Sequence, residues 1–284
     1  MWPEFVAGWE LGLYRDPIIC AIMAGLVLGY LGVFVVLKRM VFVTAAISQA
    51  SGLGVALAYF VSIHVGLEVH PFAGALLVAS AIAALCALPA QAIGLSTESL
   101  LGLAYLGCWA LAIVVGDRIA QESHDISSIL FGTAVVVPPS DVLLVSAVGA
   151  VVLLFFVVGH RGFLFITVDR DSALVQGLPV HLLELLAGGL VALEVSVTTR
   201  ALGVLPVFAF AVLPAVGALA LQPSSMGGVL LTASLLGALA GGLGYLVAFF
   251  LELPVGASQA ATALALASLC LTWRLIWTRR TARR

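Results

Sequence analysis

The chain of 284 residues is too apolar to be a soluble domain. Hydrophobic residues make up 63% of it, charged residues make up 9%, and the formal net charge is −2. A soluble domain has charged residues at about a quarter of its positions, so this chain cannot cover its surface with polar groups and a lipid bilayer must be its solvent. The small net charge, without a basic patch among aromatic residues, argues against nucleic acid as a partner.

Charged residues, prolines and turn residues divide the chain into nine apolar segments of roughly the 20 residues that a membrane-spanning helix needs. These segments are 17–37, 43–63, 71–93, 99–116, 141–159, 182–199, 201–221, 227–250 and 256–277. The sixth and seventh are the hardest to separate, because few residues lie between them and Pro206 and Pro214 can break the seventh into shorter pieces. We therefore expect an all-α polytopic membrane protein with about nine transmembrane helices (eight to ten fit the pattern). No linker or low-complexity tract interrupts it, so residues 1–284 form a single domain.

Basic residues indicate the orientation, because they accumulate in short cytoplasmic loops. The odd-numbered segments end near Lys38 and Arg39, near Arg161 and Arg170, and in the arginine-rich C-terminal tail; the other ends hold only Arg15, Arg118 and Arg200. This distribution predicts an N-terminus outside and a C-terminus in the cytoplasm. The first segment does not resemble a cleaved signal peptide, because acidic rather than basic residues precede it.

Motifs for catalysis are missing from the sequence. There is no H-E-x-x-H, no G-x-S-x-G and no C-x-x-C, and a phosphate-binding G-x-x-x-x-G-K-[ST] is excluded because Lys38, followed by Arg39, is the single lysine. The stretch "GALAGGLGYL" lies inside an apolar run, so we interpret it as a helix-packing surface rather than a dinucleotide-binding motif. We expect no catalytic residues and no cofactor bound by this chain, and any ATP hydrolysis must come from another protein.

Two loops are long enough to have functions of their own. The outer loop, 116–141, contains His124 and Asp125, whose imidazole and carboxylate suit a divalent ion in an outer vestibule; a solvated turn is the alternative. The inner loop, 160–181, contains "TVDRDSALVQGLP". Ser172 can cap a short helix there, Gly177 can end it, and Pro179 prevents its continuation. This helix is either a docking site for a partner protein or an ordinary capped loop.

Polar residues inside apolar segments are candidates for a translocation pathway, because they are costly in the hydrocarbon core. Glu194 is the most deeply placed acidic residue, and Thr198 follows it by four residues on the same helix face. A pathway role and a structural hydrogen bond to a neighbouring helix both remain open. Ser48 and Gln49 interrupt another apolar run, which continues with Gly52 and Gly54. The pairs Gly25/Gly29 and Gly237/Gly241 predict close helix contacts.

Five stretches of the chain, in order, resemble the membrane subunits of bacterial ABC importers for zinc, manganese and iron, the ABC-3 permeases. "LGVFVVLKRMVFVTAAISQASGLGVALA" resembles the family segment G-V-F-L-V-L-R-R-M-S-L-I-G-D-A-L-S-H-A-x-L-P-G-V-A. "FITVDRDSALVQGLPV" is similar to T-F-D-E-x-x-A-x-x-L-G-L-P-V. The others are "HDISSILFGTAVVVPPSDV", "TTRALGVLPVFAFAVLPAVGAL" and "LELPVGASQAA".

The resemblance implies a permease in the bacterial cytoplasmic membrane that moves a divalent metal ion inward, with zinc the first choice over manganese and iron. It implies ABC ATPase subunits, an extracytoplasmic metal-binding protein and a second copy of the chain as partners. ATP would be bound by the ATPase. Residues 169–180 would form the coupling helix in the ATPase groove, with the contributing residues Asp169, Asp171, Ala173, Leu174, Gly177, Leu178 and Pro179.

The chain departs from the family pattern at the two positions whose side chains would meet a passing cation. Ala45 stands where the family has aspartate, and Gln49 stands where it has histidine. The identity of the metal and its ligands therefore stay open. A divergent ABC permease for a non-metal substrate and a secondary transporter without an ATPase are the alternatives. An intramembrane enzyme is disfavoured, because the sequence offers no catalytic set of residues.

Overall fold

The computed structural model describes residue 9 and residues 12–87, 96–120 and 137–281, and these are almost entirely helical. The long helices are α2 (Arg15–Leu37), α3 (Val41–Val65), α5 (Thr97–Ala120), α7 (Pro139–Val158), α10 (Val180–Leu202), α11 (Val204–Leu221), α12 (Met226–Leu251) and α13 (Val255–Thr281). Three shorter helices are α4 (Pro71–Ala87), α8 (His160–Val168) and α9 (Arg170–Val175).

The expected polytopic all-α architecture is confirmed. Eight helices are long and apolar enough to cross a membrane, and α4 is a shorter apolar helix. Together they correspond to the nine segments expected from the sequence. The end of the expected third segment, after residue 87, lies outside the described residues.

Gly203 separates α10 from α11. Its φ of 93° lies in a region that favours glycine, so the chain can turn sharply between two helices with a single residue between them. The expectation that prolines break the following segment was wrong, because α11 continues through Pro214 to Leu221. Pro206 lies in the first turn of α11, where the backbone N–H needs no helical partner.

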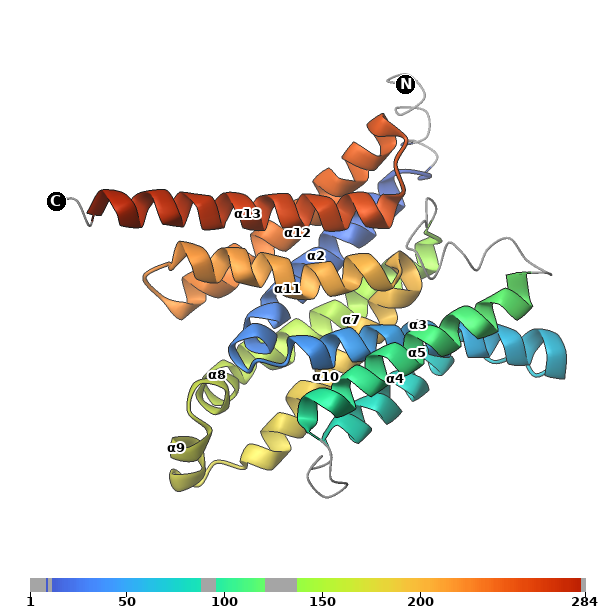
Figure 1. The fold of residues 1–284 in the computed structure, drawn as a ribbon, viewed down its shortest axis with the longest axis horizontal. Coiled ribbons are helices and arrows are strands. Elements are labelled where there is room, and N and C mark those ends of the chain that lie inside the picture. Colours follow the sequence, from blue (N-terminus) through green and yellow to red (C-terminus); the bar gives the residue numbers. More distant parts are fainter. Residues whose placement is uncertain (1–8, 10–11, 88–95, 121–136, 282–284) are drawn as a thin grey trace.

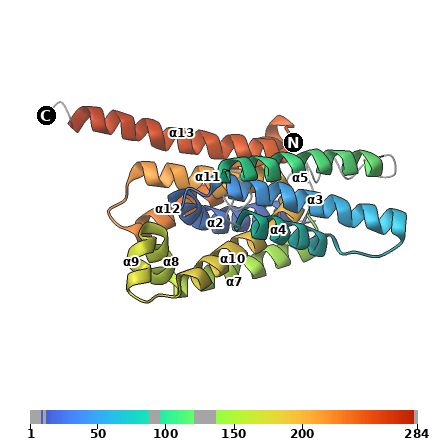
Figure 2. The ribbon, with the colours of Figure 1, turned by 60° about the horizontal axis from the view of Figure 1, so that its bottom comes forward.

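Helix α2 lies in the middle of the bundle, and most of its surface is buried (Figure 1). It packs along α12, α11 and α7, while α3 packs along α4, α5 and α10. Figure 2 shows α13 and α5 on one side of the bundle, and α7 and α10 on the opposite side. A helix that is apolar all round is typical of such a central position.

Small residues allow α2 and α12 to approach closely, as the sequence predicts. A Cβ atom added to Gly25 would lie 2.2 Å from the carbonyl oxygen of Gly237, and one added to Gly241 would lie 2.3 Å from that of Ala21. The motif "GALAGGLGYL" is part of this contact. Gly54 of α3 meets Gly74 of α4 in the same manner, at 2.2 Å. Backbone contact of this kind drives helix association where no hydrophobic effect operates.

The two ends of the bundle differ. One end, which we call the α9 end, brings together α8, α9, the last turn of α2 and the first turns of α10. At the opposite end, the first turn of α2 packs against the end of α12 and the start of α13, through Ile18, Tyr245 and Val255. The C-terminal half of α13 extends past the bundle (Figure 1).

Candidate functional site

The short helix α9 is a preformed unit on the α9 end. Asp169 is its N-cap: its carboxylate accepts hydrogen bonds from the Ser172 backbone N–H at 3.0 Å and from the Ser172 hydroxyl at 2.6 Å. These bonds lower the pKa of the exposed Asp169 carboxyl from its ordinary value. The expectation that Ser172 caps the helix was wrong. The longer reach of Asp169, one turn earlier, lets its side chain accept from the free N–H groups.

A Schellman turn ends α9 at the glycine that the sequence indicates. The Gly177 N–H donates to the Leu174 carbonyl and the Leu178 N–H donates to the Ala173 carbonyl, with φ of 78° at Gly177. Ala173 is fully buried beneath the helix, whereas Leu174 and Val175 are 41% and 88% exposed. The exposed apolar face of α9 therefore comprises Leu174 and Val175, while Ala173 anchors the helix to the bundle.

The remaining predicted coupling residues surround this helix. Asp171 and Pro179 are exposed, and Leu178 is half-buried against the core cluster that also holds Phe163 and Val180. All seven residues that the resemblance assigns to coupling therefore lie in α9 or within four residues of its ends.

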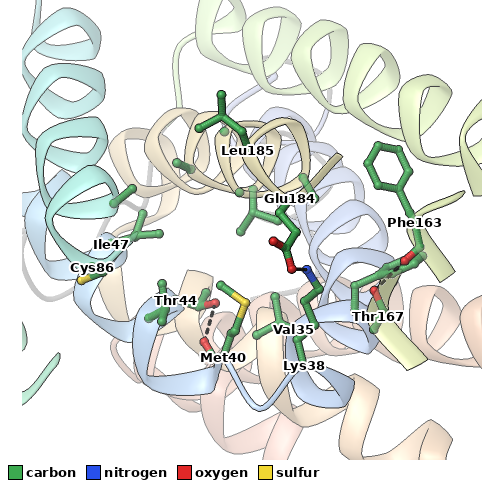
Figure 3. A pocket seen from close by; sticks show the side chains of 18 of the residues that line it. Val35, Lys38, Met40, Thr44, Ile47, Cys86, Phe163, Thr167, Glu184 and Leu185 are labelled. Carbon is green, nitrogen blue, oxygen red and sulfur yellow. Dashed lines mark hydrogen bonds and ion pairs between the residues drawn. The ribbon is translucent and has the colours of Figure 1, made fainter. Parts of the chain in front are cut away.

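A cavity of about 570 Å³ opens among α2, α3, α4, α8 and α10 (Figure 3). Its wall is mostly apolar, and its polar members include Lys38, Thr44, Thr167, His181 and Glu184. In Figure 3, the side chains of Lys38 and Glu184 point toward each other across this space. The cavity extends along α3 and α10 as far as Ile47 and Ala192.

Ser51 of α3 and Ser196 of α10 lie one helical turn beyond Ile47 and Ala192, the last residues of the cavity wall on these helices. The Ser51 hydroxyl donates to the Ser196 carbonyl at 3.5 Å, which joins the two helices. Ser48 and Thr199 are completely buried, and their hydroxyls have no hydrogen-bond partner among the described residues. Gln49 is half-buried on the adjacent face of α3. The Ser51–Ser196 hydrogen bond is therefore a polar contact between α3 and α10, one helical turn deeper than the cavity wall.

Glu194 and Thr198 lie on a different face of α10. The Thr198 hydroxyl donates to Glu194 Oε1 at 3.2 Å, and Oε2 has no hydrogen-bond partner among the described residues. A Cβ added to Gly149 of α7 would lie 3.5 Å from Oε1 and 2.9 Å from a methyl of Val27 of α2. Hence Glu194 is fully buried where α10 meets α7 and α2. The structure brings Ser51 and Ser196 together, whereas Glu194 faces α7 and α2.

An ion pair links α7 and α10 at the opposite end of the bundle. Arg200 Nη2 lies 3.1 Å from Asp141 Oδ1, and both side chains are largely buried. The predicted vestibule residues His124 and Asp125 lie outside the described residues. Among those described, no group of three or more His, Cys, Asp or Glu side chains could hold a metal ion.

Sequence reasoning missed Glu184. Its Oε1 lies 3.4 Å from Lys38 Nζ and 3.2 Å from Arg170 Nε, so one oxygen joins α2, α9 and α10. An acidic residue inside an apolar segment was the available signal, and it was overlooked because it falls near the segment's end.

Known proteins resemble the chain over nearly its full length. The family described as the ABC 3 transport family matches residues 12–273. The manganese import system permease protein ScaB of Streptococcus gordonii is 30% identical over 91% of either chain. The high-affinity zinc uptake system membrane protein ZnuB of Haemophilus influenzae is 26% identical over 78% of this chain and 85% of its own.

A solved structure agrees with these sequence relationships. The structure of PsaBC from Streptococcus pneumoniae in complex with Fab contains a chain with a TM-score of 0.83 and 27% sequence identity, and 95% of each chain is covered. The shared helical architecture and the match over residues 12–273 lead to one conclusion. The chain belongs to the ABC 3 transport family and is a membrane permease subunit of an ABC metal importer.

Proposed function

We propose that this permease moves a divalent manganese or zinc ion into the cytoplasm, driven by separate ABC ATPase subunits that dock on α9. The observation that carries this proposal is the family match over residues 12–273, which includes the capped and exposed helix α9. An extracytoplasmic binding protein would deliver the ion at the opposite end. A second copy of the chain would complete the permease in the bacterial cytoplasmic membrane.

The position of the cavity supports this direction of transport. It lies at the same end as α9, so movement of a docked ATPase acts on the elements that line it. The hydroxyl residues of the α3–α10 contact continue it toward the middle of the membrane. Of the sequence-based pathway candidates, Ser48 and Gln49 directly follow Ile47 of the cavity wall. Their neutral hydroxyl and amide groups offer a divalent ion neither a carboxylate charge nor an imidazole nitrogen. The ion would therefore pass without a tight resting site.

Co-purification with the ATPase tests the docking site. Leu174→Asp places a charge on the exposed face of α9. Gly177→Trp adds bulk there and forces a large side chain into a left-handed conformation. Both changes should abolish recovery of the ATPase with the permease. Leu253→Asp is the matched control, because Leu253 is similarly exposed at the opposite end. Full ATPase recovery with both α9 variants would contradict the assignment.

Cellular metal content tests the cargo. Cells that express the permease, its ATPase and its binding protein should contain more manganese or more zinc than cells without the permease, under limitation of each metal. Mass spectrometry of the digested cells identifies which ion accumulates. Unchanged contents of both metals would contradict transport of either one.

A second candidate function is a family member with another cargo, favoured by Ala45 and Gln49. Ala45 is buried and Gln49 is half-buried, one turn apart on α3. The double change Ala45→Asp and Gln49→His would place a carboxylate and an imidazole on one helix face. For a metal permease, this change should alter the rate of manganese or zinc uptake. A chain that transports neither metal before or after the change supports the second candidate.

A further inference from the structure

Three charged residues from different elements meet at the mouth of the cavity. Lys38 follows the last residue of α2, Arg170 is the first residue of α9, and Glu184 lies in the second turn of α10. Both cations approach the same oxygen, Glu184 Oε1, at 3.4 Å and 3.2 Å. We call these residues the Glu184 cluster. Lys38 and Glu184 also line the cavity, whereas Arg170 belongs to the exposed helix α9.

The backbone holds Lys38 firmly in this position. A Schellman turn ends α2: the Arg39 N–H donates to the Val36 carbonyl and the Met40 N–H to the Val35 carbonyl. Arg39 has φ of 57°, a left-handed conformation that is unfavourable for any residue with a Cβ. Lys38 and Glu184 thus stand on two long helices of the bundle, and Arg170 stands on a short surface helix. Of the three, Arg170 is the member that moves when α9 moves.

The charges of the cluster do not balance. Within the Glu184 cluster, two positive groups face one carboxylate, so the cluster itself carries an excess positive charge while Arg170 is in place. A cation that leaves through this mouth meets repulsion, which the apolar wall of the cavity strengthens because it screens poorly. When Arg170 withdraws, a neutral Lys38–Glu184 pair remains and the repulsion disappears.

We propose that the Glu184 cluster is an electrostatic gate, in which displacement of α9 removes Arg170 from Glu184 and lets a divalent cation leave the cavity. This inference rests on the proposed function, since it requires an ATPase on α9 and a cation as cargo. Glu184 is a positioning residue in this scheme: it holds Arg170 at the mouth and offsets part of the positive charge there.

A purely mechanical link makes a different prediction from a gate. If Glu184 only tethered α9 to α10, Glu184→Gln and Arg170→Gln would break the same contact and change transport in the same direction. In an electrostatic gate they act in opposite directions, because Glu184→Gln increases the positive charge at the mouth and Arg170→Gln decreases it. Lys38→Gln decreases it as well, although Lys38 is not part of the contact between α9 and α10. The signs of the three effects therefore separate the two schemes.

The test uses the complete transporter in proteoliposomes, with its ATPase and binding protein, and manganese or zinc ions as probes. Uptake per ATP hydrolysed should rise about threefold or more for Arg170→Gln and Lys38→Gln, and fall by a similar factor for Glu184→Gln. Raising the salt concentration should shrink these differences, because it screens exposed charges. Lys38→Gln and Glu184→Gln should retain the ATPase, since neither residue lies on α9. For Arg170→Gln, expressing uptake per ATP hydrolysed corrects for any loss of bound ATPase.

Changes of the same sign in all three variants, or no change in any of them, would overturn the gate. Failure of the proposed function is a separate result: the unmodified permease would then neither retain the ATPase nor take up either metal.

Discussion

Gly25 and Gly237 determine how close α2 and α12 can lie. Each residue places its Cα against the backbone of the other helix, with 2.2 Å from a hypothetical Cβ on Gly25 to the carbonyl oxygen of Gly237. No side chain can move aside there, because the obstructing atoms belong to the backbone. Any larger residue must therefore separate the helices.

Gly237→Ala should reduce the stability of the permease. Overpacking typically lowers the free energy of unfolding by about 1–3 kcal/mol, which should appear as a lower melting temperature in detergent. Gly102→Ala is the control: a Cβ on Gly102 of α5 meets nothing within 4 Å, and alanine favours a helix over glycine by about 0.5–1 kcal/mol. Equal melting temperatures of the two variants would contradict the backbone contact.

The burial of the Glu194 side chain and its hydrogen bond with Thr198 contribute to stability in ways that two different substitutions can separate. Its side chain is fully buried among α2, α7 and α10, and it accepts the hydroxyl of Thr198. Truncation would leave both a cavity and an unpartnered hydroxyl. An amide of the same shape would keep an acceptor for Thr198.

Glu194→Ala should lower the free energy of unfolding by about 2 kcal/mol or more, and Glu194→Gln should lower it clearly less. Thermal unfolding in detergent measures both effects. Because the carboxylate faces α2 and α7 rather than the α3–α10 contact, we expect Glu194→Gln to retain metal uptake. Loss of uptake at unchanged stability would assign the charge itself to the pathway.

At the scale of the element, α9 owes its order to its two ends. It has only six residues, too few to be stable as an isolated helix. Asp169 satisfies free N–H groups at its start, the Gly177 turn satisfies carbonyls at its end, and buried Ala173 attaches it to the bundle. Under the proposed docking, an ATPase would therefore meet an ordered helix and would not have to order a flexible loop.

Asp169→Ala should weaken association with the ATPase several-fold, because the first turn of α9 loses its cap. Asp169→Asn should retain association, since asparagine caps helices as well as aspartate does. Because the pKa of Asp169 is lowered, its cap is fully present above the ordinary pKa and is lost only as the pH falls through the lowered value. Binding assays should thus show no pH dependence from this group across the neutral range. Equal weakening by Asn and Ala would instead indicate a direct ionic contact.

At the scale of the whole molecule, the chain forms a bundle with two unlike ends. The α9 end carries the cavity and the Glu184 cluster, and the opposite end carries the Asp141–Arg200 pair. The basic residues of the sequence predict that the α9 end lies in the cytoplasm. Two exposed residues at opposite ends, Leu67 after α3 and Ser224 before α12, are suited to test this orientation.

Leu67→Cys and Ser224→Cys should react differently with a membrane-impermeant maleimide. In intact cells, we expect labelling at position 67 only; after permeabilisation, both positions should react. The four native cysteines are buried or half-buried, and the unmodified chain provides the background. Labelling of position 224 alone in intact cells would show that the α9 end faces the outside, opposite to the predicted orientation.

Much of the fold could be predicted from the sequence, because apolar length decides whether a segment spans a bilayer. The close-packing glycines and the end of α9 were equally visible, since Gly-x-x-x-Gly spacing and a Gly-x-Pro stop act locally. That α2 and α12 are the helices that pack together was not visible. The continuity of α11 through Pro214 could not be predicted from the sequence, because packing against α2 and α13 decides whether a proline breaks a helix.

The sequence by itself determined the class of protein, the positions of the apolar segments and the position of the short helix α9, because composition and local backbone preferences fix these features. Only the tertiary structure decided that Glu194 faces α2 and α7 while Ser196 faces α3. An almost uniformly apolar helix carries no periodic signal for its rotation. The tertiary structure also decided that Lys38 and Arg170 approach the same oxygen of Glu184, because such a contact depends on how helices far apart in the chain pack together.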